Sequence, residues 1–200
     1  MTQHTAIDAL QHLAQVDIDA IRAYTQAIDR CGDGALSAIL SDFREDHRRH
    51  VADLSEAIRH LGGEPPVERD VAGFFIEGMT AVAASAGRIG ALTVMESNEI
   101  VTNHAYDAAL AAELPAEVRT LVERNRTDEQ RHLAVIREEL VSTVPGGQIM
   151  SAAATAHGWS NSMLINGLRG ALPMLMIGAG AGALMAAMMG RPERNRERFR

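Results

Sequence analysis

An internal repeat runs through the first 142 residues of this 200-residue chain, and a shift of 82 positions lays one segment on another without a gap. The shift brings Asp17 onto Glu99 and Tyr24 onto Tyr106. Further matched pairs are Asp46 with Asp128, His47 with Glu129, Arg49 with Arg131 and His50 with His132. Two helical hairpins related in this way would pack about a pseudo-twofold axis. The repeat therefore predicts that the matched polar residues meet at one centre.

Four segments with helical periodicity lie between Gly- and Pro-rich breaks, and they predict an all-α four-helix bundle. The predicted helices span residues 4–30, 35–61, 72–112 and 115–142. The third is expected to be interrupted around Gly87 or Gly90. The composition agrees with helices, because 46% hydrophobic residues exclude a disordered chain and only 4% aromatic residues disfavour a β-sandwich or barrel.

Polar residues interrupt the apolar stripe of each predicted helix near its midpoint. An unpaired carboxylate or imidazole that faces a core is costly, or its pKa shifts until the group is neutral. Four such interruptions at similar depth are expected to satisfy one another, and a cation at the centre of the bundle would achieve this. The residues concerned are Asp17, His47, His50, Glu99, Glu129 and His132.

The charges divide unevenly along the chain, which has no lysine. Residues 1–149 contain 13 Arg and 24 Asp or Glu, a net charge of −11, whereas residues 191–200 contain five Arg and two Glu. The acidic part predicts no nucleic-acid partner, because phosphate binding needs a positive surface. The single cysteine, Cys31, excludes an intramolecular disulfide and an all-cysteine metal site. The first ten residues lack a secretory pattern, which predicts a cytoplasmic bundle.

The spacing of the polar residues resembles that of the ferritin-like superfamily, especially its rubrerythrin-type branch, over about residues 5–142. That family has a Glu seven residues before a Tyr on the first and third helices, and Glu-x-x-His on the second and fourth. The second half of the chain matches with Glu99, Tyr106, Glu129 and His132. In the first half, Asp17 and Tyr24 keep the spacing with a shorter carboxylate, and His47-Arg48-Arg49-His50 stands in place of Glu-x-x-His.

The resemblance implies a non-haem iron centre, mono- or dinuclear, with manganese or zinc as other possible metals. It implies the metal ligands Asp17, His47, His50, Glu99, Glu129 and His132. Residues three apart on a helix share a face, and carboxylate and imidazole ligands suit these metals. The resemblance also implies a catalytic role for Tyr24 and Tyr106, which would shield the site or relay an electron.

His47 departs from the family pattern, in which the two Glu-x-x-His glutamates bridge two metals. An imidazole at this place leaves three alternatives: a dinuclear site with one carboxylate bridge, a site for one metal, or Asp46 turned inward.

Each assignment also has a plain structural explanation. Glu129 and His132 would form an intrahelical pair, His47 and His50 would belong to an exposed basic turn, and the tyrosines would be ordinary core residues. A different helix phase would put Glu96 and Asp19 in place of Glu99 and Asp17.

The composition changes after Pro145-Gly146-Gly147. Residues 170–189 contain no charge, and twenty residues of helix span about 30 Å, the thickness of a bilayer core. Gly178 and Gly182 belong to a ridge of small residues that favours close helix pairing. The alternative is a fifth apolar helix that covers the bundle or packs between subunits.

These observations predict a ferritin-like metal-binding bundle at 1–145, a linker and amphipathic stretch at 146–169, an apolar transmembrane helix at 170–190 and an Arg-rich tail at 191–200. The expected function is iron oxidation or peroxide-linked oxidoreductase chemistry near a membrane. The alternatives are a metal-free, membrane-anchored structural or stress protein and a membrane-bound diiron hydroxylase. We expect metal ions, a membrane and further copies of the chain as partners, with a soluble cytoplasmic protein as the alternative location.

Overall fold

The computed structural model describes residues 2–67 and 87–143, and these residues form four α-helices with no strand among them. The helices are α1 (Thr2–Arg30), α2 (Gly34–His60), α4 (Gly87–Leu110) and α5 (Ala116–Thr143). All four belong to one compact unit within Met1–Asn166. The prediction of an all-helical bundle is confirmed for this part of the chain, and the bounds of α1, α2 and α5 lie within two residues of those predicted.

The breaks between helices follow from the glycines and from one aspartate. Gly32 adopts a φ of 65°, which L side chains rarely adopt, and Asp33 then caps α2 by accepting a hydrogen bond from the Leu36 amide at 3.0 Å. Gly87, with a φ of 75°, begins α4, where the sequence predicts an interruption. The preceding part of that predicted helix lies outside the described residues.

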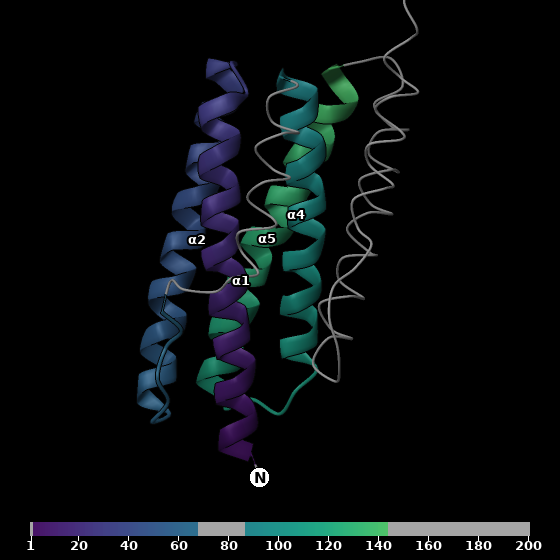
Figure 1. The fold of residues 1–200 in the computed structure, drawn as a ribbon. Coiled ribbons are helices and arrows are strands. Elements are labelled where there is room, and N and C mark those ends of the chain that lie inside the picture. Colours follow the sequence, from purple (N-terminus) through teal and green to yellow (C-terminus); the bar gives the residue numbers. More distant parts are fainter. Residues whose placement is uncertain (1, 68–86, 144–200) are drawn as a thin grey trace, which may run out of the picture. The chain divides into compact units, whose positions relative to one another are not determined.

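The helices lie side by side, with α1 packed along α2, α4 along α5, and α1 against α4 (Figure 1). Helices α2 and α5 contact each other less extensively than these three pairs do. Two apolar clusters fill the bundle, and both are made by all four helices. One contains Leu36, Leu40, Leu92, Met95, Ile136 and Leu140, and the other contains Leu10, Leu13, Leu54, Ile58, Val118 and Val122. Along every helix the buried polar residues fall between these two clusters.

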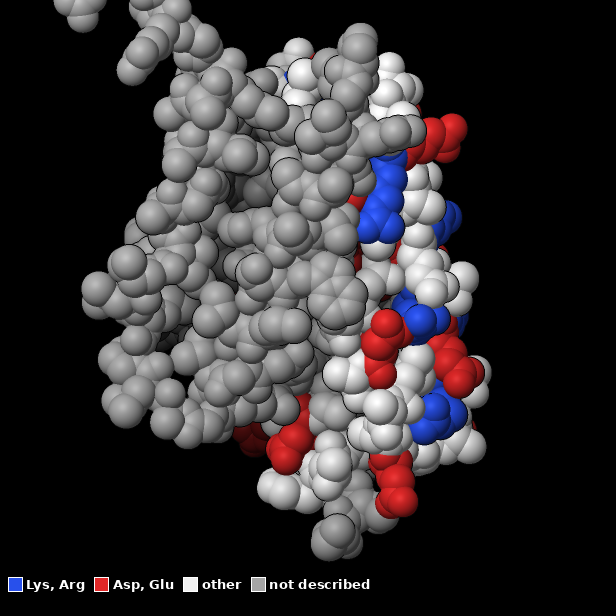
Figure 2. Space-filling model, turned by 90° about the vertical axis from the view of Figure 1, so that its right-hand side faces the viewer, with Lys and Arg blue, Asp and Glu red and all other residues white. Residues whose placement is uncertain are grey.

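The described surface carries charges of both signs. Acidic and basic side chains lie next to one another on the face drawn in Figure 2. Arg88, in the first turn of α4, donates to the capping residue Asp33 at 2.6 Å and also pairs with Glu139 of α5. Such partly exposed pairs contribute little each, but this group joins three helices at one end of the bundle.

No helix among residues 2–67 and 87–143 is long and apolar enough to span a membrane. The predicted apolar segment at 170–190 lies outside the described residues, as do the linker at 146–169 and the tail at 191–200. These boundaries stay predictions.

Candidate metal centre

Six polar side chains meet between the two apolar clusters, and all six are fully buried. We call them the central cluster. Asp17 comes from α1, Glu99 from α4, and α2 and α5 each supply two residues three positions apart, which therefore share a helix face. The central cluster consists of Asp17, His47, His50, Glu99, Glu129 and His132.

The central cluster offers two sets of four ligands whose nearest atoms lie within 4.8 Å of one another. Both sets contain His47 and Glu129. We call the set that also contains Asp17 and His50 the Asp17 group, and the set that also contains Glu99 and His132 the Glu99 group. The two groups are related by the 82-residue repeat, so the predicted meeting of its polar residues is observed.

Two tyrosines hold the carboxylates of the central cluster from the opposite hairpin. The Tyr24 hydroxyl donates to Glu99 Oε1 at 2.6 Å, and the Tyr106 hydroxyl donates to Asp17 Oδ2 at 2.7 Å. Both tyrosines are fully buried. Because each bond joins α1 to α4, the pair fixes the two hairpins relative to each other and orients both carboxylates.

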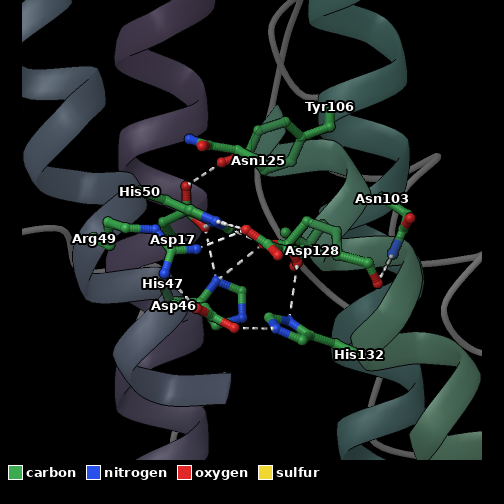
Figure 3. Close-up of polar contacts among 12 residues, drawn as sticks. Asp17, Asp46, His47, Arg49, His50, Asn103, Tyr106, Asn125, Asp128 and His132 are labelled. Carbon is green, nitrogen blue, oxygen red and sulfur yellow. Dashed lines mark hydrogen bonds and ion pairs between the residues drawn. The ribbon is translucent and has the colours of Figure 1, made fainter. Parts of the chain in front are cut away.

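Two further aspartates lie outside the histidines, at the seam between α2 and α5. Asp128 Oδ2 lies 3.2 Å from His50 Nε2, and Asp46 Oδ2 lies 3.0 Å from His132 Nε2 (Figure 3). In both rings Nδ1 is left for the interior. A carboxylate on the outer nitrogen fixes the orientation of an imidazole and makes its other nitrogen a better metal ligand.

Arg49 and Arg131 close this seam at the surface. Arg49 pairs with Asp46 and, at 2.6 Å, with Asp128, while Arg131 pairs with Asp46 and, at 3.3 Å, with Asp128. We call these four residues the arginine–aspartate ring. It neutralises the outer aspartates where few backbone contacts join α2 to α5.

Several inward-facing atoms of the central cluster have no hydrogen-bond partner although they are buried. A buried polar atom without a partner costs about 1–3 kcal/mol, so a group of them in one place requires an explanation. A metal ion that accepts their lone pairs would satisfy them together. The atoms are His47 Nε2, His50 Nδ1, Glu99 Oε2, Glu129 Oε1, Glu129 Oε2 and His132 Nδ1.

The pKa values reflect competition between burial and close opposite charges. Burial acts to lower the pKa of His50, but contacts with Asp17 and Glu129 outweigh it and raise the pKa to about 9. The pKa of His47 is likewise raised, because its three carboxylate neighbours outweigh burial. Burial raises the pKa of Glu129 to about 7. A metal would have to displace protons from these groups.

The pKa values of the other two carboxylates are lowered, whereas those of the two tyrosines are raised. Burial acts to raise the pKa of Asp17 and of Glu99, but hydrogen bonds and charges of the neighbouring histidines outweigh it, so both values are lowered. Burial, together with the adjacent carboxylates, raises the pKa of Tyr24 and Tyr106 well above the usual value. Their hydroxyls therefore stay protonated and act as donors.

The structure brings together all six predicted ligands and places both tyrosines against them. His47 and His50 are buried, so they do not form an exposed turn. Glu96 is buried but bonds to Arg137 at 2.8 Å, and Asp19 pairs with Arg22 near the surface, so neither replaces its neighbour. Asp46 does not turn inward, because its carboxylate is held by the arginine–aspartate ring and by His132.

Sequence reasoning missed the orienting role of Asp46 and Asp128. The signal was present, since the repeat matches these two residues together with Arg49 and Arg131, and each aspartate lies next to a site residue. It also missed Asn103, whose amide donates to the backbone carbonyls of Glu99 at 2.9 Å and Glu129 at 3.0 Å. The repeat places Ile21 opposite Asn103, so it gave no signal there.

These features define a class of protein: an all-α bundle whose buried histidine–carboxylate cluster has the residue types and spacing that could hold a metal ion. The chain belongs to the family described as a domain of unknown function (DUF2383), whose model matches residues 5–112, more than half of the chain. The match covers α1, α2 and α4 and ends before α5. No curated protein and no solved structure matches the chain significantly.

Proposed function

We propose that this protein is a ferritin-like metal-binding bundle that holds a non-haem iron centre in its central cluster and oxidises Fe²⁺ or reduces peroxide. The observation that carries the proposal is the convergence of six buried, unpartnered nitrogen and oxygen atoms from α2, α4 and α5. Imidazole with carboxylate suits iron, manganese and zinc, so manganese or zinc would fit the same ligands. The resemblance to rubrerythrin-type proteins favours iron.

The chain's own residues would do three things at such a centre. When bound, iron would supply electron exchange with dioxygen or peroxide. Tyr24 and Tyr106 would keep Glu99 and Asp17 in place and remain neutral donors, because their pKa values are raised by burial and by the adjacent carboxylates. The two apolar clusters would exclude water along the bundle axis, and the outer aspartates would hold His50 and His132.

Metal analysis of the full chain tests the proposal. Protein purified with Fe²⁺ or Mn²⁺ is expected to retain about one or two ions per chain by plasma emission. The double variant Glu129→Gln/His132→Gln should lose the metal, while the matched control Glu123→Gln/His60→Gln, at two exposed positions, should retain it. Wild-type protein without stoichiometric metal would contradict the proposal. If the protein does retain metal, a second assay identifies the chemistry: either ferric product forms when Fe²⁺ and dioxygen are added, or added peroxide is consumed.

A structural protein without metal is the second candidate, and the charges of the central cluster favour it. His47 and His50 have raised pKa values, since their carboxylate contacts outweigh burial, so both would be positive and would balance Asp17 and Glu99. In that case the double variant Glu129→Ala/His132→Ala would leave the fold as stable as before or more so, because it removes buried polar groups. In a metal-binding protein it would abolish stabilisation by added metal.

Attachment to a membrane through residues 170–190 and pairing through the ridge that contains Gly178 and Gly182 are parts of the same proposal. They are supported by twenty uncharged positions and by regularly spaced small residues. The partners would then be metal ions, a membrane and copies of the chain, and a lipid-modifying hydroxylase would be the related alternative. Fractionation tests this: the full chain should appear with membranes, and a chain ending at Gly147 should not. A full chain that stays in the soluble fraction would contradict attachment.

A further inference from the structure

We propose that the central cluster holds a single metal ion in the Glu99 group, bound by His47 Nε2, Glu99 Oε2, Glu129 Oε2 and His132 Nδ1. Asp17 is then a positioning residue for His47, and His50 occupies the place of a second ion. This inference rests on the proposed function, namely that the cluster binds metal at all.

The two ligand groups differ in which of their carboxylate oxygens already accept hydrogen bonds. Both carboxylate oxygens of Asp17 are already hydrogen-bonded, because Oδ1 lies 2.7 Å from His47 Nδ1 and Oδ2 accepts from the Tyr106 hydroxyl. In the Glu99 group Tyr24 occupies only Oε1 of Glu99. All four proposed ligand atoms belong to the buried, unpartnered set. In the Asp17 group the unpartnered atoms His50 Nδ1 and Glu129 Oε1 lie 3.0 Å from each other, whereas in the Glu99 group the carboxylate oxygen nearest to His132 Nδ1 lies at 3.7 Å.

The two nitrogens of His47 decide on which side the imidazole binds metal. A carboxylate only accepts hydrogen bonds, so the 2.7 Å contact with Asp17 requires the hydrogen on His47 Nδ1. In the neutral ring the lone pair then lies on Nε2. That nitrogen is 3.5 Å from Glu99 Oε1 and has no hydrogen bond. The chain thus contains a carboxylate–histidine pair that directs one lone pair into the Glu99 group.

The distances between ligand atoms agree with this assignment. Ligands at about 2.1 Å from a metal in tetrahedral geometry lie about 3.4 Å from one another. In the Glu99 group His132 Nδ1 lies 3.7 Å from Glu99 Oε2 and 3.9 Å from Glu129 Oε2, so a small contraction would close the shell. In the Asp17 group, by contrast, Asp17 and His47 already touch at hydrogen-bond distance.

His50 differs from His132 in what its inner nitrogen faces. His50 Nδ1 lies 3.0 Å from Glu129 Oε1, and its Nε2 lies 3.2 Å from Asp128. Both nitrogens of His50 thus lie no more than 3.2 Å from a carboxylate oxygen. His132 Nε2 lies 3.0 Å from Asp46, but the nearest carboxylate oxygens to its Nδ1 lie at 3.7 Å and 3.9 Å. The Glu99 group keeps room for an ion where the Asp17 group has closed.

Titration of the metal-free full chain with Co²⁺ tests the proposal, because both stoichiometry and ligand-field absorption can be read without activity. Wild-type protein should take up one Co²⁺ per chain. His132→Gln and Glu99→Gln should each weaken binding more than about 100-fold, whereas the matched variant His50→Gln should still bind one ion within about 10-fold of wild type. Two Co²⁺ per chain, or binding lost in His50→Gln and kept in His132→Gln, would overturn the single-ion assignment. No Co²⁺ uptake would overturn the proposed function as well.

The role of Asp17 has its own pair of variants. Asp17→Asn keeps an oxygen that accepts from His47 Nδ1, and Asp17→Ala removes it. If Asp17 is a positioning residue, the Asn variant should retain the wild-type Co²⁺ spectrum. The Ala variant should have a changed spectrum and should bind Co²⁺ about 10–100-fold more weakly. A directly ligating Asp17 would change the spectrum in both. Circular dichroism checks folding, and if the Ala variant does not fold, the spectrum of the Asn variant alone decides.

Discussion

The two hairpins of the bundle agree in their outer contacts and differ at the centre. In each hairpin a tyrosine donates to a carboxylate of the other hairpin, and an aspartate faces Nε2 of a histidine across the α2–α5 seam. The repeat relates these contacts position by position. The outer support of the central cluster is therefore close to symmetric.

The matched pairs that differ around the centre include Asp17 with Glu99, His47 with Glu129, Phe43 with Asn125, and Ile21 with Asn103. Phe43 stacks on His132 with ring centroids 4.2 Å apart, whereas Asn125 lies beside Tyr106 (Figure 3). The shorter carboxylate and the imidazole hydrogen-bond to each other in one half. The longer carboxylates of the other half keep oxygens without partners. A symmetric frame thus supports an asymmetric centre, in which His47 stands in one half where Glu129 stands in the other.

The largest expected effect follows from making the two halves alike at this position. His47→Glu restores a second Glu-x-x-His and removes the donor that occupies Asp17 Oδ1. Asp17 and His50 then gain a carboxylate partner, so the variant should bind two ions per chain where wild type binds one. Metal content by plasma emission and Co²⁺ titration measure the change.

His47→Gln is the control for this substitution, because it removes the imidazole without adding charge. It should bind one ion at most, and more weakly than wild type. Without metal the His47→Glu protein would carry four buried carboxylates in the central cluster and should be much less stable than wild type. Unchanged metal content in both variants would show that residue 47 does not face the metal.

The two tyrosines provide the next test of asymmetry. Tyr24→Phe and Tyr106→Phe each remove one donor from a buried carboxylate, and each should cost about 1.5–3 kcal/mol of unfolding free energy in the metal-free protein. Only Tyr24 orients a proposed ligand, Glu99. Tyr24→Phe should therefore also lower Co²⁺ affinity, while Tyr106→Phe leaves it nearly unchanged. Urea unfolding and Co²⁺ titration separate the effects, and equal loss of affinity would argue against a one-sided centre.

Much of this fold follows from periodicity and punctuation in the sequence. Leu10, Leu13 and Tyr24 recur at helical spacing, and Gly32 with Asp33 provides both a break and a cap. The interruption predicted near Gly87 has a local cause, because its positive φ favours glycine there. The segment before Gly87 lies outside the described residues.

The members of the candidate site were predictable because the repeat marks them twice. The individual role of each member was not predictable from the sequence. Which nitrogen of His47 faces Asp17, and whether Asp46 points inward or toward His132, depends on side-chain rotation within a packed core. Helix periodicity fixes which face a residue occupies but not the direction of its terminal atoms. The role of Asn103 likewise depends on the close approach of two helix backbones.

A smaller effect is expected when the pH of the metal-free protein is raised. The folded-state pKa of His50 is about 9, because its contacts with Asp17 and Glu129 outweigh burial, and burial raises that of Glu129 to about 7. Both exceed the ordinary values of 6.5 and 4.5, so the stability they contribute is complete below those ordinary values and is lost as the pH rises through about 7 and then 9. The melting temperature should fall by several degrees from pH 6 to pH 9 (about 4–8 °C per kcal/mol in a small domain).

Two controls accompany this measurement. His50→Gln should reduce the decline above pH 7, because one of the two titrating imidazoles is gone, while His47 keeps a pKa that its carboxylate neighbours raise against the effect of burial. Added metal should oppose the decline, since deprotonated ligands bind it better. A melting temperature that rises over this range in the metal-free wild type would contradict the assignment of raised pKa values.

The smallest effect is expected at the surface, where the two halves remain equivalent. Arg49 and Arg131 are about half exposed, and each pairs with both aspartates of the arginine–aspartate ring. Ion pairs of this exposure contribute about 0.2–1 kcal/mol, so Arg49→Gln and Arg131→Gln should each lower the unfolding free energy by less than about 1 kcal/mol and by similar amounts. Raising the salt concentration should shrink both effects, because exposed charges are screened. A large loss in only one of the two variants would show that the asymmetry of the centre extends through Asp46 or Asp128 to the surface.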